Sequence, residues 1–337
     1  MKRHTTQNHK QKNGQYFTTN ASDLLVGFEY VVGGRTVTEP FAGGGDLTRW
    51  CLDNGAVCVD EYDIEPLDGV AYNDSLMNPI LTNEVVVTNP PYLSKNKNKE
   101  KRIYDIWKQN DYYKCHLAAI VANQVERGIL ILPSNFLSES SSSVRDLFFS
   151  RYRMNKVKYY RKQVFEDATT GVVVFDFESW VPQSTMTCEY EVHYDTEIVY
   201  DTLTHTEKNG WLVGDEFFDM IRTDKNFKVT ILREGMVPNS NIIIGLLDKG
   251  KYSLGAHYND GEPIYCSPKA FTTYQCVLSQ DLTEEQQQQV VIKFNTILNS
   301  MRDKYHSMFL SNYMGSKQKI LSRKYAERLI EHVVQSM

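Results

Sequence analysis

The sequence lacks any hydrophobic run long enough to cross a membrane. No stretch of its 337 residues approaches the roughly 18 consecutive apolar residues of a transmembrane helix, and no secretory signal peptide opens the chain. Its six cysteines are scattered, with no Cys-x-x-Cys pair. This spacing argues against a zinc site and against a disulfide framework, and it suits a reducing cytosol. The sequence therefore predicts a cytoplasmic protein with no membrane contact and no metal centre.

Positive charge is concentrated in short clusters, although the formal net charge is −5. The segment from Asp176 to Asp224 holds 12 Asp and Glu against 2 Lys and Arg, so the rest of the chain is net positive. Three basic clusters stand out, at Lys95 to Arg102, Arg151 to Lys162 and Lys317 to Arg328. Local patches, rather than total charge, decide whether a surface can neutralise phosphates. For any one cluster alone, a solvated face is the simpler interpretation.

Strands and helices alternate along the first half of the chain. The length alone suggests two domains, or one large domain with a substantial addition. Apolar and β-branched runs predict strands at 35–39, 57–63, 70–74, 84–88, 128–132, 157–160 and 171–177, and amphipathic patterns predict helices at 46–54, 112–125 and 144–152. This alternation indicates βαβ units and a mostly parallel sheet, closed by an antiparallel pair.

The alternation fades near residue 180, where we place a domain boundary. The second half is acidic, aromatic and irregular, with a strand-like piece at 241–244 and two closing helices at 283–306 and 323–334. We therefore expect a flexible basic arm at 1–13, an α/β domain at 14–180 and an α+β domain at 181–337.

The tetrapeptide Asn89-Pro90-Pro91-Tyr92 directly follows a predicted buried strand. In an open parallel sheet, ligands bind at the carboxyl ends of the strands, so the tetrapeptide lies where chemistry is expected. Its prolines fix φ and remove two backbone donors, which leaves two acceptors, the Asn89 side-chain oxygen and the Pro90 carbonyl. Such a pair can hold both hydrogens of a planar –NH₂ group, and Tyr92 offers a face for a planar ring. An ordinary Asn-Pro turn is the alternative for the bare motif.

Acidic residues and glycines follow the first three predicted strands. The glycines of Glu39-Pro-Phe-Ala-Gly-Gly-Gly-Asp46 allow a ligand to approach the backbone, but no Gly-Lys-Ser/Thr follows and the pattern is not Gly-x-Gly-x-x-Gly. Glu39 therefore favours a cationic amino group over a pyrophosphate. Asp63 can hold ribose hydroxyls, and Asp74 can accept a hydrogen bond from an adenine amino group. Each acid alone is more often a loop residue or a helix cap.

In this order, the motifs resemble those of the S-adenosylmethionine-dependent DNA amino-methyltransferases of restriction–modification systems. The closest likeness is to the adenine-N6 group that has its cofactor motifs first and its target-recognition domain last. A Gly-Gln-Tyr-Phe-Thr-like segment precedes the sheet in that family, and Gly14 to Thr18 match it. The resemblance covers residues 12–180, and it departs in the three consecutive glycines. The neighbouring acids Glu61 and Glu65 leave the identity of the ribose ligand open.

The resemblance implies a Rossmann-like class I methyltransferase fold, an α/β fold with a mostly parallel seven-stranded sheet. It also implies S-adenosyl-L-methionine as the cofactor. The cofactor-binding residues that it implies are Tyr16, Phe17, Thr18, Glu39, Phe41, Ala42, Gly43, Gly45, Asp63, Ile64, Asp74, Ser75 and Asn89.

The same resemblance implies transfer of a methyl group to the N6 atom of an adenine that is flipped out of duplex DNA. Asn89, Pro90, Pro91 and Tyr92 are then the catalytic residues, and the flipped base stacks on Tyr92 and Phe165. An ordinary core phenylalanine is the alternative for Phe165. Residues 181–337 would read base edges, and the acidic 176–224 segment should point away from DNA. The implied phosphate contacts are Lys95, Lys97, Lys99, Lys101 and Arg102.

Other substrates present the same planar –NH₂ group. The tetrapeptide also occurs in enzymes that methylate RNA adenine or a protein glutamine, and cytosine-N4 enzymes more often have Ser in place of Asn89. The glutamine enzymes usually carry a helical domain before the fold and little after it, so the long C-terminal part here favours DNA, with RNA as the runner-up. A catalytically silent nucleic-acid-binding homologue is the other class of protein, and the intact Glu39 and Asn89 argue against it.

The expected partner is duplex DNA, and a monomer suffices for this chemistry. A restriction endonuclease acting on the same DNA site is the expected functional counterpart, with no direct contact implied. The protein would be associated with the nucleoid of a bacterium, or lie in the cytoplasm or nucleus of a host if its source is a virus.

Overall fold

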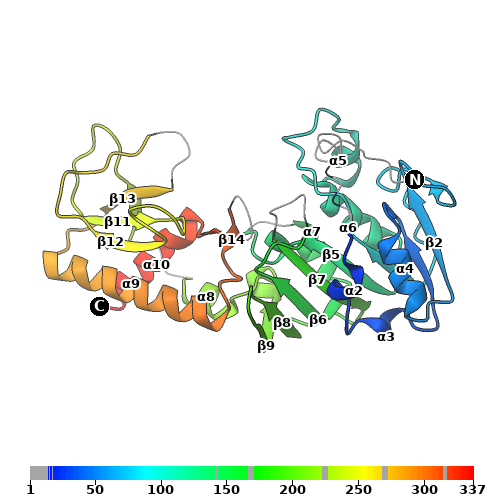
Figure 1. Cartoon of the computed structure of the whole chain (residues 1–337). Helices are drawn as coiled ribbons and strands as arrows, with labels where there is room; N and C mark the ends of the chain where they lie inside the picture. Colours follow the sequence, from blue (N-terminus) through cyan, green and yellow to red (C-terminus); the bar gives the residue numbers. More distant parts are fainter. Residues whose placement is uncertain are drawn as a thin grey trace. The chain divides into compact units, whose positions relative to one another are not determined.

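The computed structural model describes residues 14, 16, 18–140, 143–165, 171–221, 227–267, 272–313 and 317–337. The chain divides into two compact units, and the second consists of residues 137–139 and 212–337 (Figure 1). The domain boundary expected near residue 180 therefore falls at residue 211 instead. The arm expected at 1–13 lies outside the described residues.

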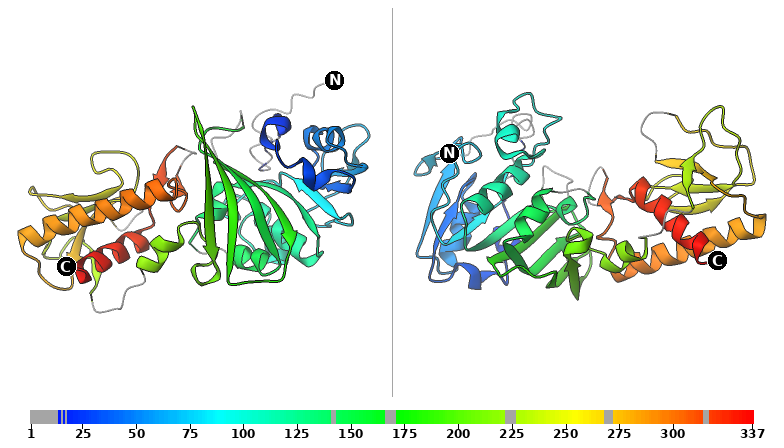
Figure 2. Two further views of the ribbon diagram at one scale, coloured as in Figure 1. Left: turned by 90° about the horizontal axis from the view of Figure 1, so that it is seen from below. Right: turned by 180° about the vertical axis from the view of Figure 1, so that it is seen from behind.

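Among the described residues, the first unit contains a nine-stranded sheet with the order β3-β2-β1-β4-β5-β7-β6-β8-β9. Figure 2 shows two further views of this sheet. Neighbouring strands are parallel from β3 to β5, and β7 is antiparallel to both β5 and β6. The first seven strands in this order form the topology of class I S-adenosylmethionine-dependent methyltransferases, as expected. The strands are β1 (Thr36–Glu39), β2 (Cys58–Asp63), β3 (Ala71–Tyr72), β4 (Val85–Thr88), β5 (Arg127–Pro133), β6 (Tyr152–Tyr160), β7 (Val172–Ser179), β8 (Thr185–His193) and β9 (Ile198–Thr206).

The sheet has two strands more than the expected seven, namely β8 and β9. β8 pairs in parallel with β6, and β9 pairs antiparallel with β8. Burial alternates along β8, where Met186, Cys188 and Tyr190 are buried and the residues between them are exposed. This period of two is the signature of a strand with one buried face. The sequence did not reveal this period because the exposed positions are acidic or hydroxylated, so the segment looked irregular.

Helices cover both faces of the sheet. Side chains from one face of β1, β4, β5 and β7 share a buried cluster with three helices. These helices are α2 (Ala21–Leu24), α3 (Glu29–Val32) and α4 (Asp46–Asp53). On the other face, α6 (Tyr112–Ala122) and α7 (Ser143–Phe149) pack together, and Phe148 lies against Phe175 and Phe177. The sequence did not predict α5 (Arg102–Trp107).

The strand order places a topological switch between β1 and β4. The chain runs outward from β1 to β2 and β3, and it then returns to the other side of β1 as β4. Connections on the two sides of a switch diverge, which leaves a crevice at the carboxyl ends of the strands. Glu39 ends β1, Asp63 ends β2 and Asn89 follows β4, so the fold brings these three residues to that edge.

The second unit is an α+β structure. Its antiparallel sheet has the order β10-β13-β11-β12, and a short hairpin pairs β14 with β15. Thr283 begins the long helix with a capping box in which Gln286 is the partner residue. The elements are α8 (Asp215–Met220), β10 (Val229–Ile231), β11 (Ile242–Gly245), β12 (Gly255–Tyr258), β13 (Thr273–Leu278), α9 (Glu284–Lys304), β14 (Ser311–Asn312), β15 (Lys319–Ile320) and α10 (Arg323–Gln335).

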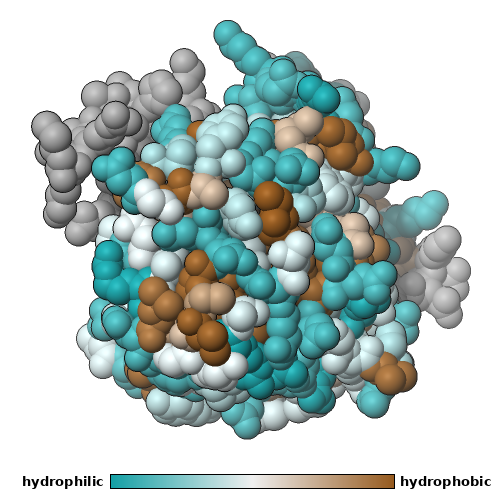
Figure 3. Space-filling view, turned by 90° about the vertical axis from the view of Figure 1, so that its right-hand side faces the viewer, coloured by the Kyte–Doolittle hydropathy of each residue, from teal (hydrophilic) through white to brown (hydrophobic). Residues whose placement is uncertain are grey.

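Within the described ranges, no helix combines the length and the apolar composition that a membrane span requires. The face drawn in Figure 3 is mainly hydrophilic, with its hydrophobic residues in small separate groups.

Candidate functional site

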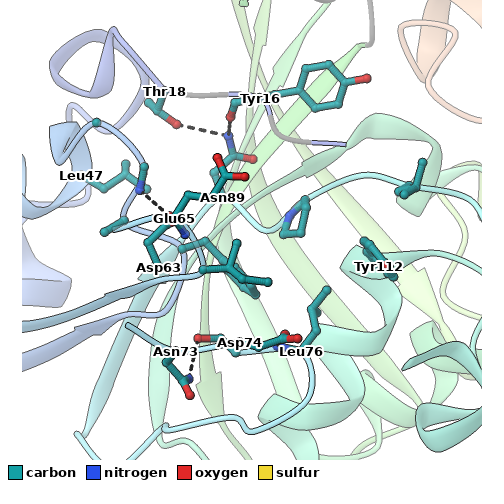
Figure 4. A pocket seen from close by; sticks show the side chains of 18 of the residues that line it. Tyr16, Thr18, Leu47, Asp63, Glu65, Asn73, Asp74, Leu76, Asn89 and Tyr112 are labelled. Atoms are coloured by element: carbon teal, nitrogen blue, oxygen red, sulfur yellow. Dashed lines mark hydrogen bonds between the residues drawn. The ribbon is translucent and has the colours of Figure 1, made fainter. Parts of the chain in front are cut away.

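A cavity of about 400 Å³ opens at the carboxyl ends of β1, β2 and β4 (Figure 4). The expected site residues among its lining are Tyr16, Thr18, Phe41, Ala42, Gly43, Asp63, Ile64, Asp74, Ser75, Asn89 and Pro91. The expected residues Glu39, Gly45, Pro90, Tyr92 and Phe165 are not part of the lining, and Phe17 lies outside the described residues. The fold thus gathers residues from segments far apart in the sequence around one space.

Glu39 lies behind the cavity wall and is only 1% exposed. Its Oε1 accepts hydrogen bonds from the Phe41 N–H at 2.9 Å and from the Thr88 hydroxyl at 2.8 Å. Its Oε2 is buried and has no hydrogen-bond partner within the described part of the chain. Burial raises the pKa of the Glu39 carboxyl to about 8. A nearby cation would offset the cost of ionising this group.

Asp63 holds two loops at the end of β2. Its Oδ2 accepts from the Gly43 N–H at 2.9 Å, and its Oδ1 accepts from the Glu65 N–H at 2.7 Å. Gly43 has a φ of +52°, a conformation that side-chain-bearing residues rarely adopt, and this turns its N–H toward the carboxylate. Each Asp63 oxygen keeps a further lone pair for a ligand hydroxyl.

Asp74 and Ser75 follow β3 and line the cavity, with Asp74 on its lower side in Figure 4. Asp74 Oδ1 accepts from the N–H groups of Leu76 and Met77 at 3.2 Å each. The buried Asn73 donates to the Ser75 hydroxyl at 3.0 Å. These local hydrogen bonds fix the turn. Among the described contacts, no backbone N–H donates to Asp74 Oδ2.

Asn89 is 8% exposed and is held by the segment that precedes the sheet. Its Nδ2 donates to the Tyr16 carbonyl oxygen at 2.7 Å and to the Thr18 hydroxyl at 3.2 Å, as Figure 4 shows. Both amide hydrogens are therefore engaged, which orients Oδ1 as an acceptor. The sequence pattern did not reveal this support, because Tyr16 and Asn89 are 73 residues apart.

Tyr92 approaches Asn89 through its hydroxyl rather than through its ring. The hydroxyl oxygen lies 2.5 Å from Asn89 Oδ1 and 2.8 Å from the Ile131 carbonyl oxygen, and both atoms can accept its hydrogen. Burial raises the pKa of the Tyr92 phenol, so the phenol keeps its proton and remains a donor.

Aromatic rings surround this contact. The Tyr16 ring lies 5.4 Å from the Tyr92 ring, and it stacks on Phe165 at 6.4 Å with an interplanar angle of 19°. Phe165 is 4% exposed and belongs to the core cluster that covers one face of the sheet. Phe165 is thus a core residue whose ring also faces Tyr16.

The backbone of Gly14 packs directly on the turn from Asn89 to Tyr92. Its carbonyl accepts from the Tyr92 N–H at 2.8 Å. Gly14 has a φ of +68°, and a Cβ atom at this position would lie 2.6 Å from the Tyr92 carbonyl oxygen. Only glycine fits here without displacing Tyr92.

The sequence did not predict one wall of the cavity, which is formed by the segment after Tyr92. Asn98, Ile103 and Tyr112 belong to the lining. Asn98 Nδ2 donates to the Tyr112 hydroxyl at 2.6 Å and to the Tyr104 hydroxyl at 3.2 Å, and the two tyrosine rings stack at 4.8 Å. The sequence shows Tyr104 and Tyr112 eight residues apart. This spacing did not predict that their rings stack, because the two residues lie on different helices.

The five expected phosphate contacts differ in their surroundings. Lys97, Lys99 and Arg102 are exposed, and their side chains make no hydrogen bond or ion pair within the described ranges. Lys95 pairs with Asp105 at 2.5 Å, and the Lys101 ammonium group donates to the carbonyl oxygens of Lys95 and Asn98.

Of the basic residues in the second cluster, Arg151 to Lys162, Lys158 is buried and Arg153 is exposed. Lys156 and Lys158 on β6 both pair with Glu191 on β8, at 2.6 and 3.4 Å, and Lys158 is 1% exposed. Part of the acidic 176–224 segment thus neutralises this cluster.

Residues 83–165 match the model of the Eco57I restriction-modification methylase family. The match includes Asn89 to Tyr92, the basic segment after them and Phe165. It confirms the expected resemblance to methyltransferases of restriction–modification systems.

Several solved structures are similar to part of this chain. A modification subunit of a putative type I restriction enzyme from Vibrio vulnificus YJ016 is 12% identical, with a TM-score of 0.45, over 55% of this chain and 48% of that one. A structure from a type I restriction–modification system is 14% identical, with a TM-score of 0.45, over 65% and 51% of the two chains.

A putative class I S-adenosylmethionine-dependent methyltransferase from Listeria monocytogenes is 10% identical, with a TM-score of 0.41, over 54% of this chain and 67% of that one. The chain spans about half the length of the first two structures. A comparison with curated protein sequences found no match. Likenesses of this degree concern the fold and carry no argument about activity.

Proposed function

We propose that this protein transfers a methyl group from S-adenosyl-L-methionine to the N6 amino group of adenine in duplex DNA. One observation carries the proposal. Asn89, at the end of β4, has both amide hydrogens engaged by Tyr16 and Thr18, so its Oδ1 is oriented as an acceptor beside a ligand-sized cavity. An –NH₂ group of this kind is a weak nucleophile and is not a base. A fixed, uncharged acceptor for its hydrogens therefore suits it.

The residues around the cavity fit the proposed cofactor. The unpartnered Oε2 of Glu39 suits a cationic amino group, and the remaining lone pairs of Asp63 suit ribose hydroxyls. Asp74 Oδ2 suits an amino group of a purine. When bound, S-adenosylmethionine supplies an activated methyl group on sulfur. Since this donor is already reactive, the residues of the chain have to position the acceptor nitrogen rather than form a covalent intermediate.

Asn89 Oδ1 and the Pro90 carbonyl are the two acceptors for the amino hydrogens. Hydrogen bonds to both hydrogens favour a pyramidal nitrogen, whose lone pair is no longer delocalised into the ring and is free to attack. The turn is rigid and Asn89 is already oriented, so the reorganisation needed at Asn89 is the release of the Tyr92 hydroxyl from Oδ1. The proton released from the nitrogen passes to solvent.

The target adenine has to leave the duplex, because its amino group is engaged in a base pair. Flipping costs a few kcal/mol, and stacking on an aromatic side chain returns about 1–3 kcal/mol. Tyr92 and Phe165 are the proposed stacking residues, and the exposed Lys97, Lys99 and Arg102 are proposed to contact phosphates.

The test is methyl transfer from tritiated S-adenosylmethionine to unmethylated duplex DNA, with structured RNA assayed in parallel. The variant Asn89→Ala removes the acceptor, and Asn123→Ala is a matched control because Asn123 is exposed at the end of α6. The expected product is N6-methyladenine in DNA, retained in the control and lost in Asn89→Ala. Label in RNA alone or in methylcytosine would overturn the proposed substrate, and calorimetry without cofactor binding would overturn the proposed chemistry.

A further inference from the structure

The cavity beside Asn89 is lined by acidic side chains and not by basic ones. Among the described residues that form its lining there are five carboxylates and no lysine, arginine or histidine. The five are Asp46, Asp63, Glu65, Asp74 and Glu100, of which Figure 4 labels three, Asp63, Glu65 and Asp74. Carboxylates that surround one concave space add their fields, so this cavity attracts positive charge.

The basic segment from Lys95 to Arg102 contributes to this lining with its single acid. The segment holds five basic residues and one acid, Glu100. Glu100 lines the cavity, whereas none of the five basic residues belongs to the described lining. The Lys101 ammonium group, for example, donates to the carbonyl oxygens of Lys95 and Asn98. The fold therefore places the negative charge of this segment at the cavity and its positive charges elsewhere.

Two of the five carboxylates, those of Glu65 and Glu100, belong to exposed residues, and no cation of the described chain pairs with either of them. Glu100 Oε1 accepts from the Arg102 N–H at 2.9 Å, which leaves its negative charge uncompensated by another side chain. Asp46 pairs with Arg49 at 3.4 Å, and the Arg49 side chain is 65% exposed. An ion pair that is so exposed contributes little, so it removes little of the field in the cavity.

The proposed methyl donor and its product differ in the charge on one atom. S-adenosylmethionine carries a positively charged sulfonium group in addition to its amino and carboxyl groups. The methyl group leaves without the electron pair of its bond to sulfur, and this pair cancels the charge of the sulfur in S-adenosylhomocysteine. The remaining groups of the two molecules are the same. A field that favours positive charge therefore acts on the difference between them.

We propose that the acidic lining, through Glu65 and Glu100 in particular, makes the cavity bind S-adenosylmethionine more tightly than S-adenosylhomocysteine and so limits inhibition by the product. The inference rests on the cofactor assigned in the proposed function. Glu39 does not distinguish the two molecules, because the amino group that it is proposed to hold is present in both. Glu65 and Glu100 act on the additional positive charge and are thus specificity-determining residues for the methyl donor.

The test measures the Kd of both molecules by calorimetry for the unaltered protein and for the variants Glu65→Gln and Glu100→Gln. The unaltered protein should bind S-adenosylmethionine more tightly. Each substitution should raise the Kd of S-adenosylmethionine about two- to fivefold, the value of one exposed ion pair, and leave that of S-adenosylhomocysteine unchanged. Because both side chains are exposed, added salt should reduce the preference.

A matched control and a second ligand accompany this measurement. Glu197→Gln removes an exposed carboxylate between β8 and β9, outside the lining, and should leave both Kd values unchanged. Sinefungin carries an ammonium group in place of the S-methyl group, so its Kd should rise in the two cavity variants as that of S-adenosylmethionine does. Circular dichroism checks that each variant is folded.

The outcomes separate this inference from the proposed function. Equal Kd values for the two molecules in the unaltered protein would overturn the inference, even if the protein methylates DNA. Equal weakening of both molecules in the glutamine variants would also overturn it. A preference that decreases in both variants would support the inference, and absence of methyl transfer to DNA would then overturn only the proposed substrate. If neither molecule binds, the inference and the proposed function both fail.

Discussion

The Tyr92 hydroxyl lies 2.5 Å from Asn89 Oδ1, the same atom that the proposed reaction requires as an acceptor for the amino group of adenine. In the free protein, the Tyr92 hydroxyl therefore already donates a hydrogen bond to Asn89 Oδ1. The Tyr16 ring also stacks on Phe165 and lies 5.4 Å from Tyr92, so it covers surfaces proposed for the target base. A base that enters the site has to replace both contacts, which adds to the cost of flipping.

Replacing Tyr92 by phenylalanine keeps the ring and removes the hydroxyl that competes for Asn89. We expect target-base flipping to become more favourable by the value of one hydrogen bond, so the Kd for DNA should fall about two- to tenfold. A duplex with 2-aminopurine at the target position should show increased fluorescence when it binds the Tyr92→Phe variant. Unchanged fluorescence and affinity would show that the hydroxyl does not compete with the base.

The same substitution should destabilise the fold, because the Ile131 carbonyl loses a buried donor. The matched control is Tyr152→Phe, since the buried Tyr152 hydroxyl donates to the Ile120 carbonyl at 3.2 Å, outside the site. Both variants should lose about 1–3 kcal/mol of unfolding free energy in urea, and only Tyr92→Phe should alter base flipping.

Replacing Gly14 by alanine should disrupt the turn from Asn89 to Tyr92. The new Cβ atom would lie 2.6 Å from the Tyr92 carbonyl oxygen, so Tyr92 has to move. Gly34→Ala is a matched control, because Gly34 has a similar φ of +70° and nothing within 4 Å of its Cβ position. Both variants should lose about 1–2 kcal/mol through backbone strain. Only Gly14→Ala should lose methyl transfer, and equal activities in the two variants would contradict a role for this close approach.

The pKa of Glu39, about 8 in the folded chain, predicts opposite effects of Glu39→Gln on stability and on cofactor binding. The folded chain binds this proton more tightly than the unfolded chain, so the contribution of Glu39 to stability is present below pH 4.5 and is lost as the pH rises toward 8. At pH 8, Glu39→Gln should therefore be more stable than the unaltered chain, by about 4 kcal/mol. At pH 4.5 the two should be equally stable in thermal unfolding.

Cofactor binding should show the reverse preference. A cationic amino group favours ionised Glu39, so binding should release a proton and the affinity should rise between pH 6 and about 7.5, below the usual range in which an α-amino group deprotonates. Calorimetry in buffers of different ionisation enthalpy measures the released proton. Glu39→Gln should bind the cofactor more weakly and release no proton, and proton release by this variant would assign the effect to another group.

Replacing Glu191 by glutamine should destabilise the sheet between β6 and β8. Glu191 pairs with Lys156 and with Lys158, which is 1% exposed, so its loss leaves a buried ammonium group without its ion-pair partner. We expect a loss of about 3–5 kcal/mol in denaturant unfolding. Glu189→Gln is the matched control, because Glu189 lies on the same strand and is exposed. Similar stabilities of the two variants would show that Lys158 is stabilised by other contacts.

The sequence by itself determined the elements whose signals are local. Strands β1, β2, β4 and β5 and helices α4, α9 and α10 lie where the apolar periodicity predicted them, because a buried face imposes a period of 2 or 3.6 on its own residues. The turn from Asn89 to Tyr92 and the acids at the ends of β1 and β2 were also visible. The end of a parallel strand is a fixed place in this fold, so a polar residue there predicts a site.

The tertiary structure decided which of these residues touch one another. Tyr16 supports Asn89 across 73 residues, and the Tyr92 hydroxyl occupies the acceptor of Asn89 instead of leaving it open. Pairing also decided that β8 and β9 extend the sheet, and that Glu191 neutralises Lys158 inside it. Local patterns report which face of an element is buried, whereas hydrogen bonds and ion pairs between distant segments depend on which elements pack together.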